Sequence, residues 1–270
     1  MAGIGFELRK LLERDSLSGV LQAYLYASII GAGPWVLSIV GILVIGLLSG
    51  AVGGPGLLVS QFQVSVTYLI AASLILTGFV QLAFTRFIAD RLYEKQEAIV
   101  LPNFNGVSAL VTTVSGCLGL AAVTFQFRDE SVLYRLLMLT GFVMLSNIWV
   151  ATIFLSGLKQ YKQILLLYAL GYGVSVASAL VLRPLGLEGL LLGFVLGHGV
   201  MLLGMVLLVA RSYPAEKFIA FDFAKRGAMF GSLVLVGFLY NLGVWLDKIM
   251  FWYGPGTGAP VIGPLHASVI

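Results

Sequence analysis

The chain has 270 residues, of which 59% are hydrophobic and only 10% are charged, with a formal net charge of +4. Soluble domains carry roughly 25% charged residues, because their surfaces need polar side chains to stay in solution. The composition therefore excludes soluble, disordered and collagen-like proteins and predicts an all-α polytopic membrane protein. The 33 glycines support this class, since glycine is more frequent in membrane helices than in soluble ones.

The sequence holds no pattern typical of a catalytic or metal site. One cysteine, Cys117, excludes a disulfide framework and a thiolate metal cluster. The two histidines, His198 and His266, stand in unrelated contexts. A phosphate-binding loop, a G-x-S-x-G elbow and an H-E-x-x-H pair are all missing from the sequence. We therefore expect no catalytic residues, no metal and no cofactor, and we predict that the chain is not an enzyme.

Residues 1–18 are expected to form an amphipathic helix in the cytoplasmic membrane interface. Ile4, Leu8 and Leu11 share one helical face, which is the pattern of a helix that lies in the headgroup region. Glu7 and other acidic residues interrupt the basic positions, so this start is not a signal peptide. A frayed polar tail is the alternative.

Long apolar segments predict the transmembrane organisation, because a spanning helix needs about 20 mostly apolar residues. Seven segments meet this criterion: 19–49, 60–85, 105–126, 132–157, 162–182, 188–210 and 228–253. The first six form one bundle over residues 19–210, and a cytoplasmic connection, 211–227, leads to the seventh span. A Gly/Pro-rich periplasmic loop, 254–270, follows it. Its composition suggests that the chain is the N-terminal part of a longer protein.

The positions of the basic residues predict the orientation. Of the 16 Lys and Arg residues, 12 lie in the N-terminal segment and the even-numbered connections, and 4 lie on the other side. Because cytoplasmic loops carry the excess of Lys and Arg, the N-terminus is expected in the cytoplasm.

Small residues at helical spacing on the fifth and sixth spans predict a compact helix bundle. They are Gly171, Ser175 and Ala179 on the fifth span and Gly189, Gly193 and Gly197 on the sixth. Membrane helices associate through such ridges because small side chains let their backbones approach.

The first span is expected to be broken at Gly31, Gly33 and Pro34, since proline removes a backbone hydrogen bond and disturbs the preceding turn. Interrupted helices in corresponding positions of two halves are typical of transporter sites. The seventh span offers a partial counterpart, because Gly33 and Trp35 align with Gly243 and Trp245 at one offset. A true internal repeat and a chance match both remain open on this alignment.

Two charged residues, Asp247 and Lys248, lie inside the seventh apolar segment. Charges at membrane depth are costly and therefore usually serve a function. Neighbours on a helix point about 100° apart, so we expect that the two cannot simply neutralise each other. Lys248 would reach the headgroups, and Asp247 would face a polar cavity as part of a cargo pathway or a coupling-ion site. The alternative is a structural ion pair, for example between Asp247 and Arg135.

Further candidates for the cargo pathway or ion coupling are Tyr240, Asn241, Trp245, Trp35 and Arg135. For Asn241, the simpler role is hydrogen bonding between helices. For Arg135, the alternative is a position at the membrane interface. The second span also begins with an unusual run of polar residues, which suits a helix that lines a wet cavity or one that enters from the headgroups. They are Gln61, Gln63, Ser65, Thr67 and Tyr68.

Three stretches resemble one known family. They are the opening MAGIGFELRKLL (1–12), the segment from Tyr24 to Trp35, and YNLGVWLDK (240–248). Together they are similar to the PelG family, the membrane exporters of Pel exopolysaccharide. That family is related to the multidrug/oligosaccharidyl-lipid/polysaccharide (MOP) flippases, which have twelve or more spans in two six-helix halves. By this resemblance the chain holds the first half and the start of the second.

The resemblance implies export of a cationic aminosugar polymer, a biofilm exopolysaccharide, across the inner membrane by alternating access. It implies partners as well: a cytoplasmic glycosyltransferase and a membrane protein that senses cyclic di-GMP, with polysaccharide as cargo, membrane lipids around the chain and no nucleic acid. No residue-level cargo motif is carried over from the family.

Cargo charge offers a check on these residues. A cationic polymer favours an acidic and aromatic lining, such as Asp247 with Tyr240 and Trp245. A lipid-linked oligosaccharide carries a pyrophosphate and favours a cationic one. The sequence does not choose between them, so a lipid-linked oligosaccharide flippase stays open. A non-transporting membrane scaffold of a polysaccharide synthase and an integral-membrane transferase stay open as well.

Overall fold

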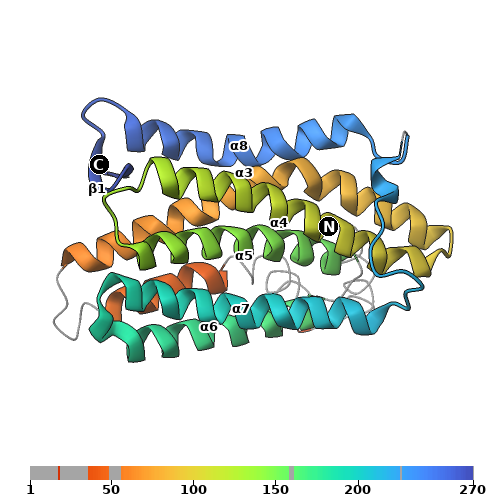
Figure 1. The fold of residues 1–270 in the computed structure, drawn as a ribbon, viewed down its shortest axis with the longest axis horizontal. Coiled ribbons are helices and arrows are strands. Elements are labelled where there is room, and N and C mark those ends of the chain that lie inside the picture. Colours follow the sequence, from red (N-terminus) through yellow and green to blue (C-terminus); the bar gives the residue numbers. More distant parts are fainter. Residues whose placement is uncertain (1–17, 19–35, 49–55, 158–160, 226, 270) are drawn as a thin grey trace.

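The fold is an antiparallel array of long apolar helices (Figure 1). The structure, a computed structural model, describes residues 18, 36–48, 56–157, 161–225 and 227–269. The six longest helices are α3 (Gly56–Tyr93), α4 (Val100–Phe125), α5 (Val132–Gly157), α6 (Tyr161–Leu182), α7 (Leu187–Ser212) and α8 (Gly231–Tyr253). All six are long and apolar enough to cross a membrane. In hydrocarbon, a helix is favoured because it satisfies every backbone hydrogen bond within its own segment.

These helices coincide with the last six of the seven predicted spans, and the all-α class is confirmed. Of the first predicted span, 19–49, the structure describes a shorter apolar helix, Val36–Leu48. The predicted break at Gly31, Gly33 and Pro34, together with Trp35, lies outside the described residues. The same is true of the predicted interfacial helix, apart from Ser18.

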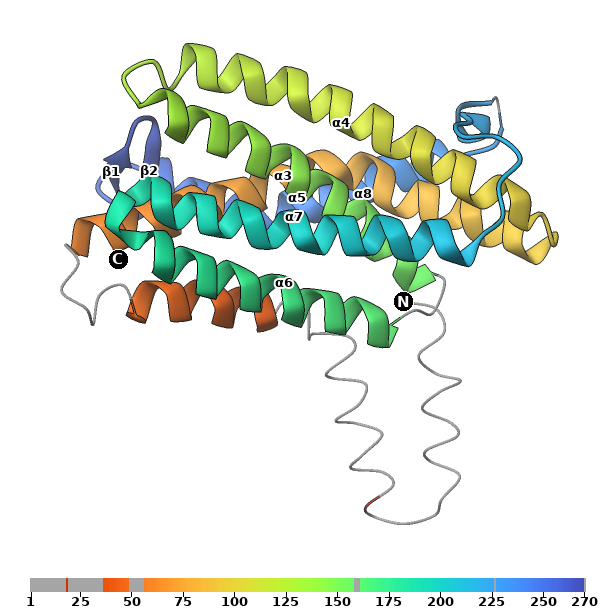
Figure 2. The ribbon, with the colours of Figure 1, turned by 60° about the horizontal axis from the view of Figure 1, so that its bottom comes forward.

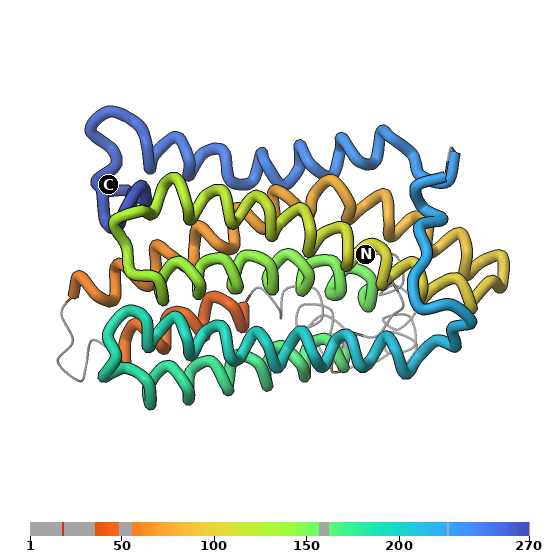
Figure 3. Tube along the Cα trace, in the orientation of Figure 1, coloured from red at the N-terminus to blue at the C-terminus, as the bar shows by residue number. Residues whose placement is uncertain are grey.

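Successive helices run in opposite directions, as the tube in Figure 3 shows. The α3–α4 turn, which contains the 3-10 helix Glu97–Ile99, and the connection between α7 and α8 lie at one end of the array. The α4–α5 turn, the α6–α7 turn with the 3-10 helix Arg183–Leu185, and the C-terminal segment lie at the other. We call these the linker end and the hairpin end.

Small residues bring α6 and α7 together along their length. A Cβ on Gly193 would collide with the backbone of Ala179, and one on Gly197 would collide with Ser175. The helix Val36–Leu48 lies beside α6 (Figure 2), where Gly41 leaves room for the ring of Tyr172. The predicted ridges therefore act as packing surfaces.

The core lies where α3, α5 and α7 meet. Phe62 on α3 contacts Phe194 on α7 edge-on, and Phe84 on α3 stacks with Phe154 on α5. All four side chains are buried. α3 lies between α5 and α8, so it positions the side chains that these two helices meet.

The segment 254–270, expected to be a loop, contains a short β-hairpin. β1 (Gly258–Ile262) pairs antiparallel with β2 (Leu265–Ser268) through a turn at Gly263 and Pro264. Gly263 has a positive φ of 47°, which glycine adopts without steric cost. The buried side chains Ile262 and Leu265 hold the hairpin against the hairpin end of the helices.

Candidate functional site

The candidate site is the seam where α8 packs along α3. The two helices cross at Gly78 and Gly237, where a Cβ on Gly78 would lie 2.8 Å from the carbonyl oxygen of Gly237. One residue further on, the rings of Phe79 and Phe238 stack with centroids 4.1 Å apart. The helix backbones therefore touch at this point, and the side chains on either side of it determine what the seam does.

Amide and hydroxyl groups surround the crossing of the two helices. The Asn241 Nδ2 donates to the Gln81 Oε1 at 3.4 Å and to the Gly237 carbonyl at 3.0 Å. The Gln81 Nε2 donates to the Thr77 hydroxyl at 2.8 Å. At membrane depth such groups must find partners within the protein, and here they find one another. Asn241 thus bonds between helices, the simpler of its two predicted roles.

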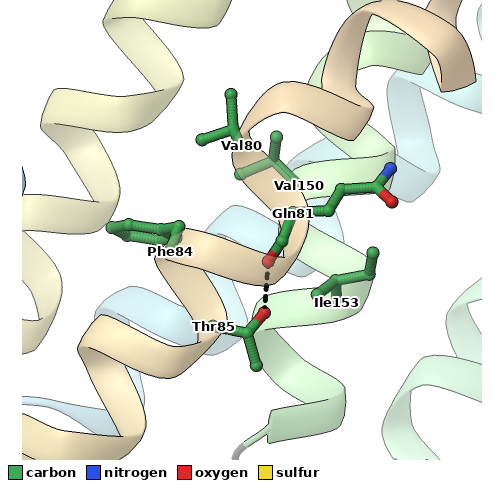
Figure 4. A pocket seen from close by; sticks show the side chains of 6 residues that line it. All are labelled: Val80, Gln81, Phe84, Thr85, Val150 and Ile153. Atoms are coloured by element: carbon green, nitrogen blue, oxygen red, sulfur yellow. Dashed lines mark hydrogen bonds between the residues drawn. The ribbon is translucent and has the colours of Figure 1, made fainter. Parts of the chain in front are cut away.

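Gln81 also borders a narrow recess between α3 and α5, shown in Figure 4. The Thr85 hydroxyl donates to the Gln81 backbone carbonyl at 2.7 Å. Val150 and Ile153 of α5 form the opposite wall. The recess lies between α3 and α5 and has no room for a sugar ring.

The polar start of the second span contacts neighbouring elements. Ser65 and Tyr134 of α5 share a hydrogen bond of 2.8 Å between their hydroxyls. Gln61 and Tyr68 contact the hairpin, and Thr67 donates to the carbonyl of Gln63 one turn earlier at 2.7 Å. The polarity of this segment therefore serves contacts with α5 and with the hairpin.

Five aromatic rings meet at the hairpin end of the seam, a group that we call the aromatic collar. It comprises Tyr68 of α3, Trp245, Trp252 and Tyr253 of α8, and His266 of β2. Tyr68 and Trp252 stack with centroids 4.3 Å apart and planes 26° apart. Of the sequence-predicted residues for the cargo pathway, only Trp245 belongs to this group. The spacing of Trp245 and Trp252, seven residues apart and so on one helix face, is the sequence signal that points to Trp252.

Asp247 and Lys248 lie at the surface of the described part of the chain, with side chains 63% and 47% exposed. The expectation that they cannot neutralise each other is wrong. The Lys248 Nζ lies 3.1 Å from the Asp247 Oδ1, because its four-carbon stem bends back along the helix. The same Nζ donates to the Val244 carbonyl at 3.2 Å and sits 5.7 Å from the centre of the Trp245 ring.

Two other predicted residues lie away from the seam. Tyr240 on α8 is 70% exposed. Arg135 is in the first turn of α5, and its Nε is buried with no hydrogen-bond partner among the described residues. Within that part of the chain Arg135 makes no ion pair with Asp247, which instead pairs with Lys248. The structure thus brings Asn241 and Trp245 into the seam, but it does not bring Tyr240, Asp247 or Arg135 there.

The linker end is fastened by a second polar contact. The connection 213–230 carries the 3-10 helix η3 (Asp222–Ala224). Its Asp222 accepts from the Asn103 Nδ2 of α4 at 3.0 Å, while the Asp222 backbone N–H donates to the Asn103 Oδ1 at 2.8 Å. Hydrogen bonds from Lys225 and then from Asn103 hold the pKa of the Asp222 carboxyl below its usual value. Phe223 is buried against Phe84 and Phe87 of α3.

Among the described residues, no group of three or more His, Cys, Asp or Glu side chains is placed to hold a metal ion. The seam therefore offers hydrogen-bonding amides, hydroxyls and aromatic rings. Those are groups that suit recognition of a polar, uncharged or weakly cationic surface.

Comparison with known proteins gives one match. Residues 1–270 match the model of the PelG family, described as "Putative exopolysaccharide Exporter (EPS-E)". No curated protein and no solved structure matches the chain.

Proposed function

Because the chain belongs to the PelG family of exopolysaccharide exporters, we propose that it moves a cationic aminosugar polysaccharide across the bacterial inner membrane by alternating access. The family match covers all 270 residues and is the observation that carries the proposal. Its members are exporters and not enzymes, and six helices of this chain are able to span a membrane. The cationic cargo, the transport cycle and the inner membrane are the parts that we add.

The distribution of charge supports the proposed orientation. The linker end carries the described basic residues Arg86, Arg91, Lys95, Lys162, Arg211, Lys217 and Lys225, and the hairpin end carries Arg128, Arg135, Arg183 and Lys248. The excess of Lys and Arg favours a cytoplasmic linker end. Cargo would then enter at the linker end and leave at the hairpin end.

Closure of the seam supports alternating access. At the Gly78–Gly237 crossing and the Gln81–Asn241 bond, α3 and α8 are in direct contact, so a sugar chain cannot pass between them there. A transporter needs such a state to prevent leakage while its cargo site faces the other side. We further propose that the chain acts with a cytoplasmic glycosyltransferase and a cyclic di-GMP-sensing membrane partner, within a synthase and export complex.

A substitution of Asp247 separates transport from a scaffold role. In cells that lack the native protein, the chain with Asp247→Asn is expected to reduce secreted polymer several-fold, since removing the carboxylate leaves Lys248 without its partner. Co-purification of the partner proteins is expected to be unchanged. Secreted polymer is measured by lectin binding and assembly by affinity pull-down.

Glu216→Gln is the matched control, because it removes the same charge at an exposed position outside the membrane-spanning segments. Equal secretion from the two variants would count against a transport role for Asp247. Loss of complex assembly with Asp247→Asn would support the scaffold role instead. If the unmodified chain fails to restore secretion, the export proposal itself fails.

A further inference from the structure

The aromatic collar has the composition of a carbohydrate-binding site. We propose that it binds a sugar ring of the exported polymer, and that the β1–β2 hairpin uncovers it. The inference rests on the proposed export function and deepens it by naming the residues that would hold the cargo. It starts from three features of the collar: rings that cover one another, a buried donor without an acceptor, and a hairpin held by few bonds.

Ring faces in the collar are covered by other rings of the collar. Tyr68 of α3 and Trp252 of α8 lie almost parallel, 4.3 Å apart, and Tyr253 approaches Tyr68 edge-on at 6.4 Å. Neither Tyr68 nor Trp252 is fully buried. A pyranose ring presents a flat face of C–H groups of similar size to an indole ring. It is therefore able to replace Trp252 on the face of Tyr68 when the two side chains separate.

Trp245 supplies a hydrogen-bond donor that lacks an acceptor. Its side chain is buried, with the residue only 9% exposed, and among the described residues its Nε1 has no hydrogen-bond partner. A buried donor left unpaired costs about 1–3 kcal/mol, so a ligand that brings an acceptor is favoured there. Sugar hydroxyl and ring oxygens are such acceptors. Trp252 lies 6.2 Å from Trp245, between centroids, so one ligand is able to meet both.

A cationic sugar gains a further contribution. Ammonium groups are attracted to aromatic faces, most strongly to tryptophan. Lys248 already makes such a contact in the collar, because its Nζ lies 5.7 Å from the centre of the Trp245 ring. An amino group on the cargo would take the same kind of position over Tyr68 or Trp252. The collar is therefore expected to favour an amino sugar over its uncharged N-acetylated form.

The hairpin that covers the collar is anchored by its buried side chains Ile262 and Leu265, and only a few hydrogen bonds join it to the helices. The Tyr68 hydroxyl donates to the His266 carbonyl at 3.1 Å and accepts from the His266 N–H at 3.3 Å. The Gln61 Nε2 donates to the Val261 carbonyl at 3.5 Å, and the Tyr253 hydroxyl donates to the Pro264 carbonyl at 3.1 Å. Each such bond contributes only about 1 kcal/mol net. Movement of the hairpin releases Tyr68 and exposes the collar in one step.

Variants of Tyr68 test ring stacking separately from the hairpin contact. Purified protein in lipid nanodiscs is titrated with a glucosamine hexamer and with an N-acetylglucosamine hexamer, and binding is followed by tryptophan fluorescence. Tyr68→Phe keeps the ring and removes both hydrogen bonds to His266, so we expect equal or tighter binding. Tyr68→Leu removes the ring, and we expect affinity for the glucosamine hexamer to fall by about tenfold.

Phe79→Leu is the matched control, because Phe79 also stacks between α3 and α8 but lies outside the collar. It is expected to bind the hexamer as the native chain does. Overturning results are equal loss with Phe79→Leu, unchanged affinity with Tyr68→Leu, or equal loss with both Tyr68 variants. A Trp245→Phe variant keeps a ring, loses the N–H and leaves Tyr68 unchanged. It is expected to weaken binding several-fold, so it tests the collar even if the Tyr68 variants misfold.

A cross-link tests the movement of the hairpin. In a Cys117→Ser background, the changes Gln61→Cys and Val261→Cys place two thiols across the α3–hairpin contact. Bridging them with a short bis-maleimide is expected to stop polymer secretion, while either single cysteine leaves it unchanged. Continued secretion after bridging would overturn the role of the hairpin and leave the export proposal intact. Lack of secretion from the unmodified chain would instead defeat the export proposal.

Discussion

At the scale of single residues, polar side chains of the described helices pair with one another across helix contacts. Gln81 and Asn241 satisfy each other between α3 and α8, and Ser65 and Tyr134 do the same between α3 and α5. Among the described residues, four buried side-chain atoms have no hydrogen-bond partner: the Trp245 Nε1, the His198 Nε2, the Arg135 Nε and the Arg91 Nε. In a membrane protein, such exceptions mark positions where a partner of another kind is expected.

Asp222 gives the linker contact a pH dependence. Hydrogen bonds to the ionised carboxylate lower its pKa from the ordinary value of 3.8, so folding favours the charged form. The resulting stabilisation is fully present above that value and is lost as the pH falls through the lower pKa of the folded state. We expect the amide-exchange protection factors of residues 218–225, which correct for the intrinsic pH dependence of exchange, to fall below about pH 4.

The control for this experiment lies in the same linker. Asp222→Asn is expected to show faster exchange at neutral pH with little further change on acidification. Glu216→Gln removes an equal charge and is expected to keep the native profile. A native profile from Asp222→Asn would show that this carboxylate does not hold the linker to Asn103.

At the scale of elements, α8 touches the rest of the described chain along one side. Its contacts are with α3 and with the hairpin, whereas α6 and α7 bury each other along their whole length. A single crossing at Gly78 and Gly237 therefore sets the position of α8. Substitution of one glycine at that crossing is expected to have a larger effect than elsewhere on the helix.

We expect Gly237→Ala to lower the stability of the protein by about 1–3 kcal/mol, because its Cβ would collide with the carbonyl of Gly78. Gly243→Ala, on the same helix, has open space around its Cβ and is expected to be neutral or slightly stabilising. Thermal unfolding in detergent, followed by size-exclusion chromatography, compares the two. Equal melting temperatures would mean that α8 does not pack on α3 at this point.

The spans were predictable from the sequence, and the seam was not. A helix that crosses the membrane must be apolar over about 20 residues, so the length of an apolar run such as Leu187–Ser212 is enough to predict a helix. Gln81 is one amide within such a run, and its importance depends on Asn241, 160 residues away. The hairpin was missed because its glycines and prolines are also typical of loops. The Asp247–Lys248 pair was misjudged because helix geometry fixes the direction of a Cβ but not the reach of a lysine.

At the scale of the whole molecule, the charge bias predicts which end faces the cytoplasm. In a Cys117→Ser background, a cysteine introduced by Lys95→Cys in the α3–α4 turn is expected to resist a membrane-impermeant maleimide in intact spheroplasts. One introduced by Asp129→Cys in the α4–α5 turn is expected to react. Labelling is read from a gel shift, with permeabilised cells as the positive control. The reverse pattern would invert the entry and exit sides proposed for the cargo.

The length of α3 has a mechanical consequence. Its 38 residues correspond to about 57 Å of unbroken helix, longer than a bilayer with its headgroups. One stiff rod thus carries the hairpin contact at Tyr68 and the ring contact with Phe223 at Phe87, about 28 Å apart along its axis. The glycine crossing at Gly78 lies between these two contacts and would act as a pivot. A tilt of α3 about this crossing that breaks the contact at one end of the helix would tighten the contact at the other end. The hairpin end and the linker end would therefore not open at the same time.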